Sequence, residues 1–164
     1  MNMVRVRRLL LALAALVVLA QIFQPARTNP PIIESRTLKA HVEIPQPVQA
    51  ILERACSDCH SNRTVWPWYS HVAPLSWFVV DDVNQGRRHL NFTDWEAQRN
   101  PQEASEHLGL ICKELKTGAM PLFSYRLVHP KSRLSEQEIH QVCLWSEALA
   151  PQPANPPIPG HDRH

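Results

Sequence analysis

Apolar residues recur in helix-length segments along the chain, and the first segment has no polar face. Arg5, Arg7 and Arg8 precede the run Leu9–Ala20, which contains no polar residue. A basic head followed by a short apolar run is typical of a secretory signal or a short membrane anchor. Residues 1–23 are therefore predicted to form a signal peptide or a membrane anchor.

The same basic residues predict which way the chain faces. Positive charge beside an apolar segment tends to stay in the cytoplasm, so the rest of the chain is expected on the other side of the membrane. That places it in the periplasm, at the inner membrane if residues 1–23 are retained. Disulfides persist in such a compartment.

Later segments repeat apolar residues at helical spacing, and no segment alternates with a period of two. The predicted helices cover residues 47–56, 74–86, 104–117 and 135–149, with a short helix starting at Thr93. Ser135 and Glu138 form a capping-box pattern, and Gly86 and Gly118 are expected to end the helices before them. Residues 46–150 are therefore predicted to be one small all-α domain.

The chain has fifteen prolines and only four glycines, and many of the prolines lie on either side of this domain. Residues 24–45 contain several of these prolines and no apolar periodicity, which predicts an extended Pro-rich linker. Residues 151–164 are predicted to be a disordered Pro-rich tail. The formal net charge of +2 is too small to indicate a nucleic-acid partner.

The candidate chemistry begins where the first helix of the domain ends. Cys56-Ser-Asp-Cys59-His60 matches the C-x-x-C-H pattern of covalent haem attachment. Each thiol would add to one haem vinyl group, and His60 would become the proximal ligand of the iron. The predicted cofactor is one covalently attached haem c with its iron.

Other interpretations of the cysteines stay open at this point. A redox dithiol needs a βαβ context that the pattern lacks, and a structural zinc site needs four ligands. Cys112 and Cys143 are single cysteines on the expected buried faces of two helices, where they form either a disulfide or two buried thiols. A Cys56–Cys59 disulfide would close a very short, strained loop.

The best candidate for the second axial ligand is Met120, which lies 60 residues after His60 in a predicted loop and is followed by Pro121. Methionine with histidine is a known ligand pair that raises the reduction potential of a haem. The alternatives are a methionine that only fills the core, or a histidine ligand such as His71.

Large aromatic residues cluster within residues 66–125, after the motif, and suit a flat apolar cofactor. The residues expected in the haem pocket are Trp68, Tyr69, Trp77 and Tyr125. An ordinary aromatic core is the alternative. Arg87 and Arg88 would either neutralise the haem propionates or end a solvated helix, and a carbonyl near Pro74 is a candidate acceptor for the His60 Nδ1–H.

Four segments carry a resemblance to a known family: CSDCHSNRTVWPWYSHVAPLSW (56–77), DVNQGRRHLNFTDW (82–95), GAMPLFSYRLVHP (118–130) and LSEQEIHQVCLW (134–145). In this order they resemble the bacterial haem-binding domain family, small exported proteins with a single C-x-x-C-H. The resemblance implies a fold similar to class I cytochrome c. It also implies attachment through Cys56 and Cys59, with His60 as proximal and Met120 as distal ligand.

A haem with both axial positions filled has no open site for a substrate, which favours an electron carrier over an enzyme. The expected partners are redox proteins in the periplasm or at the membrane. A haem-based sensor or gas-binding module would need a labile Met120. A peroxidase-like enzyme would need a polar group such as His71 or His89 at an open distal position. A structural domain with zinc or a disulfide would be colourless.

Overall fold

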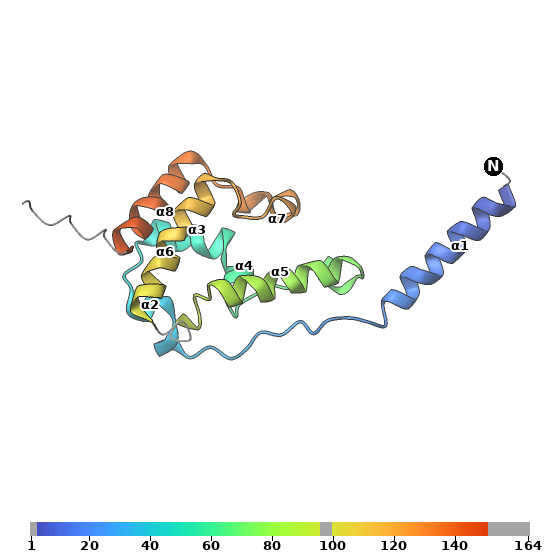
Figure 1. Cartoon of the computed structure of the whole chain (residues 1–164), viewed down its shortest axis with the longest axis horizontal. Helices are drawn as coiled ribbons and strands as arrows, with labels where there is room; N and C mark the ends of the chain where they lie inside the picture. The colour runs from blue at the N-terminus through green and yellow to red at the C-terminus, as the bar shows by residue number, and fades with distance from the viewer. Residues whose placement is uncertain (1–2, 96–99, 151–164) are drawn as a thin grey trace, which may run out of the picture. The chain divides into compact units, whose positions relative to one another are not determined.

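The computed structural model describes residues 3–95 and 100–150, and in this part of the chain the regular structure is helical throughout (Figure 1). The prediction of an all-α fold is therefore confirmed. The described residues form two compact units, one made of residues 3–42 and 56–95 and the other of residues 43–55 and 100–150. The chain thus crosses between the units immediately before Cys56.

The first unit begins with α1 (Met3–Ala20), whose large apolar side chains are mostly exposed. Three arginines occupy its N-terminal half. Nowhere in the described residues is there a helix long and apolar enough to cross a membrane. The other helices of this unit are η1 (Glu34–Arg36), α2 (Leu38–His41), α4 (Ser57–His60), η2 (Trp68–His71) and α5 (Leu75–His89).

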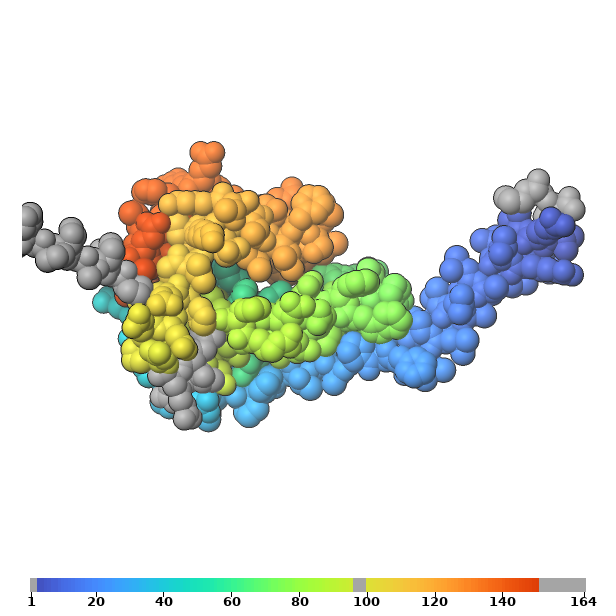
Figure 2. Space-filling model, in the orientation of Figure 1, coloured from blue at the N-terminus to red at the C-terminus, as the bar shows by residue number. Residues whose placement is uncertain are grey.

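The linker residues of the first unit run along α5 and are held there by hydrogen bonds (Figure 2). Asn29 donates from Nδ2 to the Thr64 carbonyl at 2.9 Å, and Arg27 donates to the Ser70 carbonyl at 3.1 Å. The linker also contains α2, which the prolines around it gave no reason to expect. The Leu38 N–H of α2 donates to the Phe92 carbonyl at 2.8 Å, which ties this helix to the same unit.

Helix α5 continues past its predicted end at Gly86. The Leu90 N–H still donates to the Gly86 carbonyl, and the helix ends only at His89. The prediction failed because Gly86 is buried in the interior of the helix, where its lack of a Cβ permits close packing. Gly118, in contrast, has a φ of +71° just after the helix Pro101–Lys116 and ends that helix as expected.

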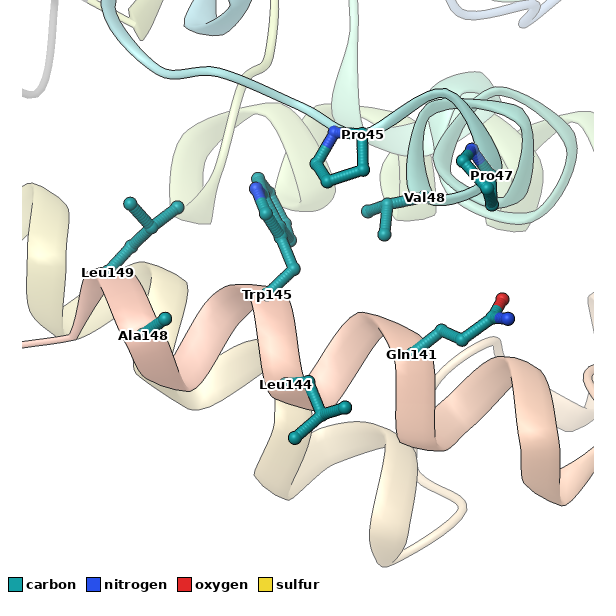
Figure 3. A pocket seen from close by; sticks show the side chains of 8 residues that line it. All are labelled: Pro45, Pro47, Val48, Gln141, Leu144, Trp145, Ala148 and Leu149. Carbon is teal, nitrogen blue, oxygen red and sulfur yellow. The ribbon is translucent and has the colours of Figure 1, made fainter.

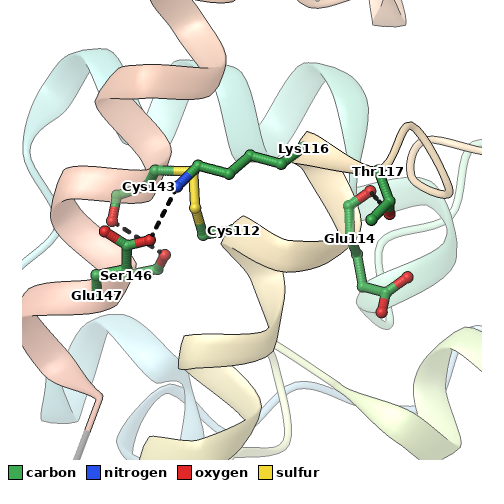
Figure 4. Close-up of a disulfide and its surroundings, with 7 residues drawn as sticks. All are labelled: Cys112, Glu114, Lys116, Thr117, Cys143, Ser146 and Glu147. Carbon is green, nitrogen blue, oxygen red and sulfur yellow. Dashed lines mark hydrogen bonds and ion pairs between the residues drawn. A yellow bond between two sulfur atoms is a disulfide. The ribbon is translucent and has the colours of Figure 1, made fainter. Parts of the chain in front are cut away.

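The second unit contains α3 (Gln46–Ala55), α6 (Pro101–Lys116), α7 (Phe123–Val128), η4 (Pro130–Ser132) and α8 (Glu136–Leu149). The Cys112–Cys143 disulfide joins α6 to α8 (Figure 4). Of the two possibilities that the sequence left open for these cysteines, the structure has the disulfide. Arg54 on α3 pairs with Glu138 on α8 at 2.5 Å.

The ends of the long helices in this unit follow ordinary capping chemistry. Asn100 accepts a hydrogen bond from the Gln102 N–H, and Pro101 occupies the first turn of α6, so this helix begins earlier than predicted. Ser135 and Glu138 form the expected capping box of α8. The short helix expected to start at Thr93 falls largely on residues 96–99, which lie outside the described residues.

The second unit also has an apolar groove of about 400 Å³ between α8 and the start of α3 (Figure 3). Trp145, Leu144 and Leu149 line it from α8, opposite Pro45 and Val48. The Trp145 indole donates to the Glu43 carbonyl at 3.1 Å, which fixes the ring in the groove. None of the candidate haem residues lines this groove.

Candidate haem site

The C-x-x-C-H motif forms its own short helix, α4, which is separated from α3 by a break at Cys56. Cys56 has φ −125° and ψ −34°, outside helical geometry, and its carbonyl accepts from the His60 N–H at 2.9 Å. Cys56 and Cys59 are both half-buried, and neither is in a disulfide. One helical turn therefore presents two thiols and an imidazole.

The His60 ring has a defined hydrogen bond and a defined tautomer. Its Nδ1 lies 3.0 Å from the Leu90 carbonyl oxygen. Because a carbonyl can only accept, Nδ1 must carry the proton, and in the neutral ring Nε2 then keeps its lone pair. Burial lowers the pKa of His60, which favours this neutral form. A carbonyl near Pro74 was the predicted acceptor, and that prediction is wrong.

The main chain of His60 is tied to the same segment. Its carbonyl accepts a hydrogen bond from the Phe92 N–H at 2.8 Å. Side chain and main chain of His60 are therefore both bonded to residues 90–92, which follow α5. This segment belongs to residues 82–95, which carry part of the family resemblance, but nothing in the sequence indicated that its main chain bonds to His60.

Helix α5 approaches the motif closely at Gly86. A Cβ atom added to Gly86 would lie 2.6 Å from the Cys59 carbonyl oxygen. The packing leaves the Cys59 thiol in a poorly solvated place, and burial, followed by the charges of Asp82 and Asp58, raises the pKa of Cys59 to about 12. The thiol is therefore protonated at neutral pH.

The loop that follows the motif is bonded back to it through Asp58. The Asp58 carboxylate accepts from the Val65 N–H at 3.0 Å, and its carbonyl accepts from the Thr64 hydroxyl at 2.7 Å. Asp58, a middle position of C-x-x-C-H, thus has a structural role here. It fixes the course of the chain after His60.

Arg87 holds this loop from the other side. Its guanidinium donates to the Ser61 carbonyl at 2.8 Å and to the Thr64 hydroxyl at 2.7 Å, and it also reaches the linker at Thr28. The side chain that was a candidate for the propionates is therefore engaged by protein groups. Arg88 is exposed at the end of the same helix.

Three of the predicted aromatic pocket residues lie in the first unit, with different surroundings. Trp68 is 77% exposed and meets Tyr69 edge-on at 5.8 Å. Burial, followed by the charges of Asp58 and Cys59, raises the pKa of Tyr69. The Trp77 indole donates to the Phe23 carbonyl at 2.7 Å, so this N–H is used to hold the N-terminal segment.

Trp66 belongs to the same group of aromatic residues, and its indole N–H has different surroundings. This donor is buried and has no hydrogen-bond partner among the described residues. A buried donor without an acceptor costs free energy, and a haem propionate is the kind of acceptor that would satisfy it. Trp66 is thus a residue of the first unit that suits the cofactor.

Met120 and Tyr125 belong to the second unit. Met120 follows the end of α6, is half-buried, and donates from its N–H to the Glu114 carbonyl at 3.1 Å. Tyr125 stacks on His129 with ring centroids 4.2 Å apart. The roles of these residues at a haem stay predictions.

The donor set of the first unit fits a haem. It combines two thiols outside any disulfide, an imidazole with Nε2 available for iron, and an unsatisfied indole donor. Haem proteins use thiols and imidazoles of this kind to attach and ligate the group. The fold and site together define an all-helical protein with a haem-type site on α4.

Comparison with known proteins agrees with this class. The family model described as the haem-binding domain matches residues 15–148, most of the chain. The chain belongs to this family and is a haem-binding protein, as its sequence segments indicated. No curated protein and no solved structure matches it. The matched range includes the linker, in agreement with the contacts that hold residues 27–29 on the first unit.

Proposed function

We propose that this haem-binding protein is an exported electron carrier of the c type. Cys56 and Cys59 hold one haem through thioether bonds, His60 is the proximal ligand and Met120 is the distal ligand. The bound haem supplies an iron that changes its oxidation state. The observation that carries the proposal is the hydrogen bond from His60 Nδ1 to the Leu90 carbonyl, which leaves Nε2 for the iron.

The chain's own residues serve this function by holding residues 56–60, the C-x-x-C-H turn, in place. Gly86 lets α5 lie against Cys59, and the loop after His60 is fixed by Asp58 and Arg87. A histidine whose ring and main chain are both bonded has little freedom to rotate. A fixed ligand reduces the rearrangement that accompanies a change of oxidation state.

The N-terminal segment supports the proposed location. Three arginines precede an apolar run in α1, the arrangement of an export signal. Residues 1–23 would direct the chain to the periplasm, where redox proteins would be its partners. Mass spectrometry of the protein from periplasmic and membrane fractions would show whether this segment is removed, and recovery from the cytoplasm alone would contradict export.

Covalent attachment is tested with two pairs of cysteines from the same chain. The full chain is expressed with haem-attachment machinery, and haem is detected after denaturing electrophoresis. The double variant Cys56→Ala/Cys59→Ala is expected to lose the covalent haem. The matched double variant Cys112→Ala/Cys143→Ala should keep it, because those sulfurs form the disulfide between α6 and α8. Covalent haem in the first variant would refute the assignment.

The axial ligands are tested by the absorption spectrum of the reduced protein before and after carbon monoxide is added. A spectrum that carbon monoxide leaves unchanged is expected for a haem with both axial positions filled. Met120→Ala should open the distal position to carbon monoxide, and His60→Ala should lose the low-spin spectrum. His71→Ala is the control for the histidine change. A wild-type spectrum that shifts would instead favour a sensor or a gas-binding module.

A further inference from the structure

A buried cluster of polar side chains beside the motif has no part in the function proposed above. It consists of Asn62, Asn91 and Thr93, which are 7%, 8% and 7% exposed. We refer to these three residues as the Asn–Thr cluster. Burying polar groups costs free energy unless their hydrogen bonds are made, so their bonds show what the cluster holds together.

The hydrogen bonds of the cluster close a ring. The Thr93 hydroxyl accepts from the Asn62 N–H at 2.7 Å and donates to Asn91 Oδ1 at 2.9 Å. Asn91 Nδ2 in turn donates to Asn62 Oδ1 at 2.9 Å. The Thr93 N–H also donates to Asn91 Oδ1 at 3.0 Å, which closes a local turn.

This ring joins the two chain segments that meet at His60. Asn62 lies two residues after His60, and Asn91 directly follows Leu90, whose carbonyl accepts from His60 Nδ1. Between Asn91 and Thr93, the Phe92 N–H donates to the His60 carbonyl. His60 therefore has two bonds to residues 90–92, one from its ring and one to its carbonyl. The cluster joins the same two chain segments next to both of them.

We propose that the Asn–Thr cluster holds the Leu90 carbonyl against the His60 ring and thereby sets how strongly this ring donates electrons to the haem iron. Asn91 and Thr93 are positioning residues that act through His60. The proposal rests on the proposed function, in which His60 is the proximal ligand. A firm hydrogen bond at Nδ1 raises the basicity of a ligating imidazole, which favours ferric iron and lowers the reduction potential.

The test is Thr93→Val in the full-length protein loaded with haem. Valine keeps the shape of threonine, but it leaves the Asn62 N–H without its acceptor and Asn91 without one of its donors. We expect a higher reduction potential. We also expect the His60 Nδ1–H to exchange with solvent about two- to tenfold faster in the ferrous state, the factor that corresponds to one weakened hydrogen bond.

Two further variants separate this effect from a general loss of stability. Thr93→Ser restores the hydroxyl and should restore the wild-type potential and exchange rate. Thr117→Val removes a hydroxyl that donates to the Glu114 carbonyl in the second unit and should change neither value. If Thr93→Val does not fold, Asn91→Ala replaces it, because it leaves the bond from the Asn62 N–H to Thr93 intact.

The outcomes distinguish this inference from the function on which it rests. Thr93→Val, or Asn91→Ala in its place, with wild-type potential and wild-type exchange would overturn the inference while His60 remains a ligand. A wild-type ferric protein without hyperfine-shifted signals from the His60 ring would refute the ligand assignment and with it the inference. A raised potential with faster exchange in the variant, reversed in Thr93→Ser, would support both.

Discussion

Gly86 and Cys59 are in backbone contact: a Cβ atom at residue 86 would lie 2.6 Å from the Cys59 carbonyl oxygen. The backbone of α5 therefore limits how closely α4, which carries the C-x-x-C-H motif, can pack against it. This relationship connects the C-x-x-C-H motif with a glycine that the sequence pattern assigned only to the end of a helix.

The contact predicts that Gly86→Ala destabilises the protein. Alanine improves helix propensity by about 1 kcal/mol, but its methyl group would meet main-chain atoms that cannot rotate away. We expect a net loss of about 1–3 kcal/mol in the free energy of unfolding, as for other overpacked sites. Urea unfolding of the full chain measures this loss, and haem content per protein should fall with it.

The matched control for this change is Asn84→Ala, on an exposed position of the same helix. It introduces the same side chain without a close contact and should leave both stability and haem content near wild type. A Gly86→Ala variant as stable as wild type would mean that α5 and α4 do not pack this closely.

The Cys112–Cys143 disulfide predicts a stabilised second unit. The two cysteines are 31 residues apart, and closing a loop of this size in the unfolded chain is worth about 3–4 kcal/mol in the chain-entropy model. Cys112→Ala/Cys143→Ala should lose free energy of unfolding on this scale in urea. A reductant should lower the free energy of unfolding of the wild type by a similar amount and leave that of the double variant unchanged. A wild type whose stability does not change with reductant would contradict the disulfide.

The capping box of α8 predicts a dependence of stability on pH. The Glu138 carboxylate accepts from the Ser135 N–H at 2.9 Å, and this bond is the main cause that lowers the pKa of Glu138 from its ordinary value of 4.5. A carboxyl with a lowered pKa in the folded state stabilises the protein above its unfolded pKa. This contribution is lost as the pH falls from about 4.5 through the folded pKa.

Glu138→Gln should therefore lower the urea midpoint at pH 7 and match the wild type more closely at pH 3. The variant also loses the ion pair with Arg54. Glu136→Gln removes a negative charge from the same first turn without the capping bond and should cost less at pH 7. A gap between Glu138→Gln and wild type that is as wide at pH 3 as at pH 7 would contradict the assigned role of the carboxylate.

The helices of the second unit were largely predictable because local signals and apolar spacing agreed. Ser135 and Glu138 marked the start of α8 and Gly118 followed the end of α6. Helix α7 (Phe123–Val128) was missed because it is short and its side chains are largely exposed, so no apolar stripe marks it.

Gly86 misled for a different reason. The sequence alone cannot distinguish a glycine that ends a helix from a glycine that lets a neighbouring backbone pack closely. Here the packing of α4 against α5 shows that Gly86 is of the second kind. The acceptor of the His60 proton, the Leu90 carbonyl, is a main-chain group, and every residue has one. The motif therefore predicted which side chains form the candidate site but could not predict what orients them.

Arg87 joins three parts of the first unit through one side chain. Its Nε donates to the Ser61 carbonyl at 2.8 Å, and its Nη1 donates to the Thr28 carbonyl at 2.8 Å. Its Nη2 donates to Asn29 Oδ1 at 2.9 Å and to Thr64 Oγ1 at 2.7 Å. The planar guanidinium can make these bonds together because its donors point in fixed, diverging directions.

This arrangement predicts that Arg87→Gln releases the linker from the first unit. The variant loses both hydrogen bonds from Arg87 to the linker, at Thr28 and Asn29, so limited trypsin cleavage after Arg27 should become faster. Arg87→Lys keeps the charge but not the diverging N–H donors of the guanidinium, so it should be cleaved at an intermediate rate. Arg88→Gln, on the exposed next residue, is the control and should be cleaved like wild type. Equal cleavage after Arg27 in Arg87→Gln and wild type would show that Arg87 does not hold the linker.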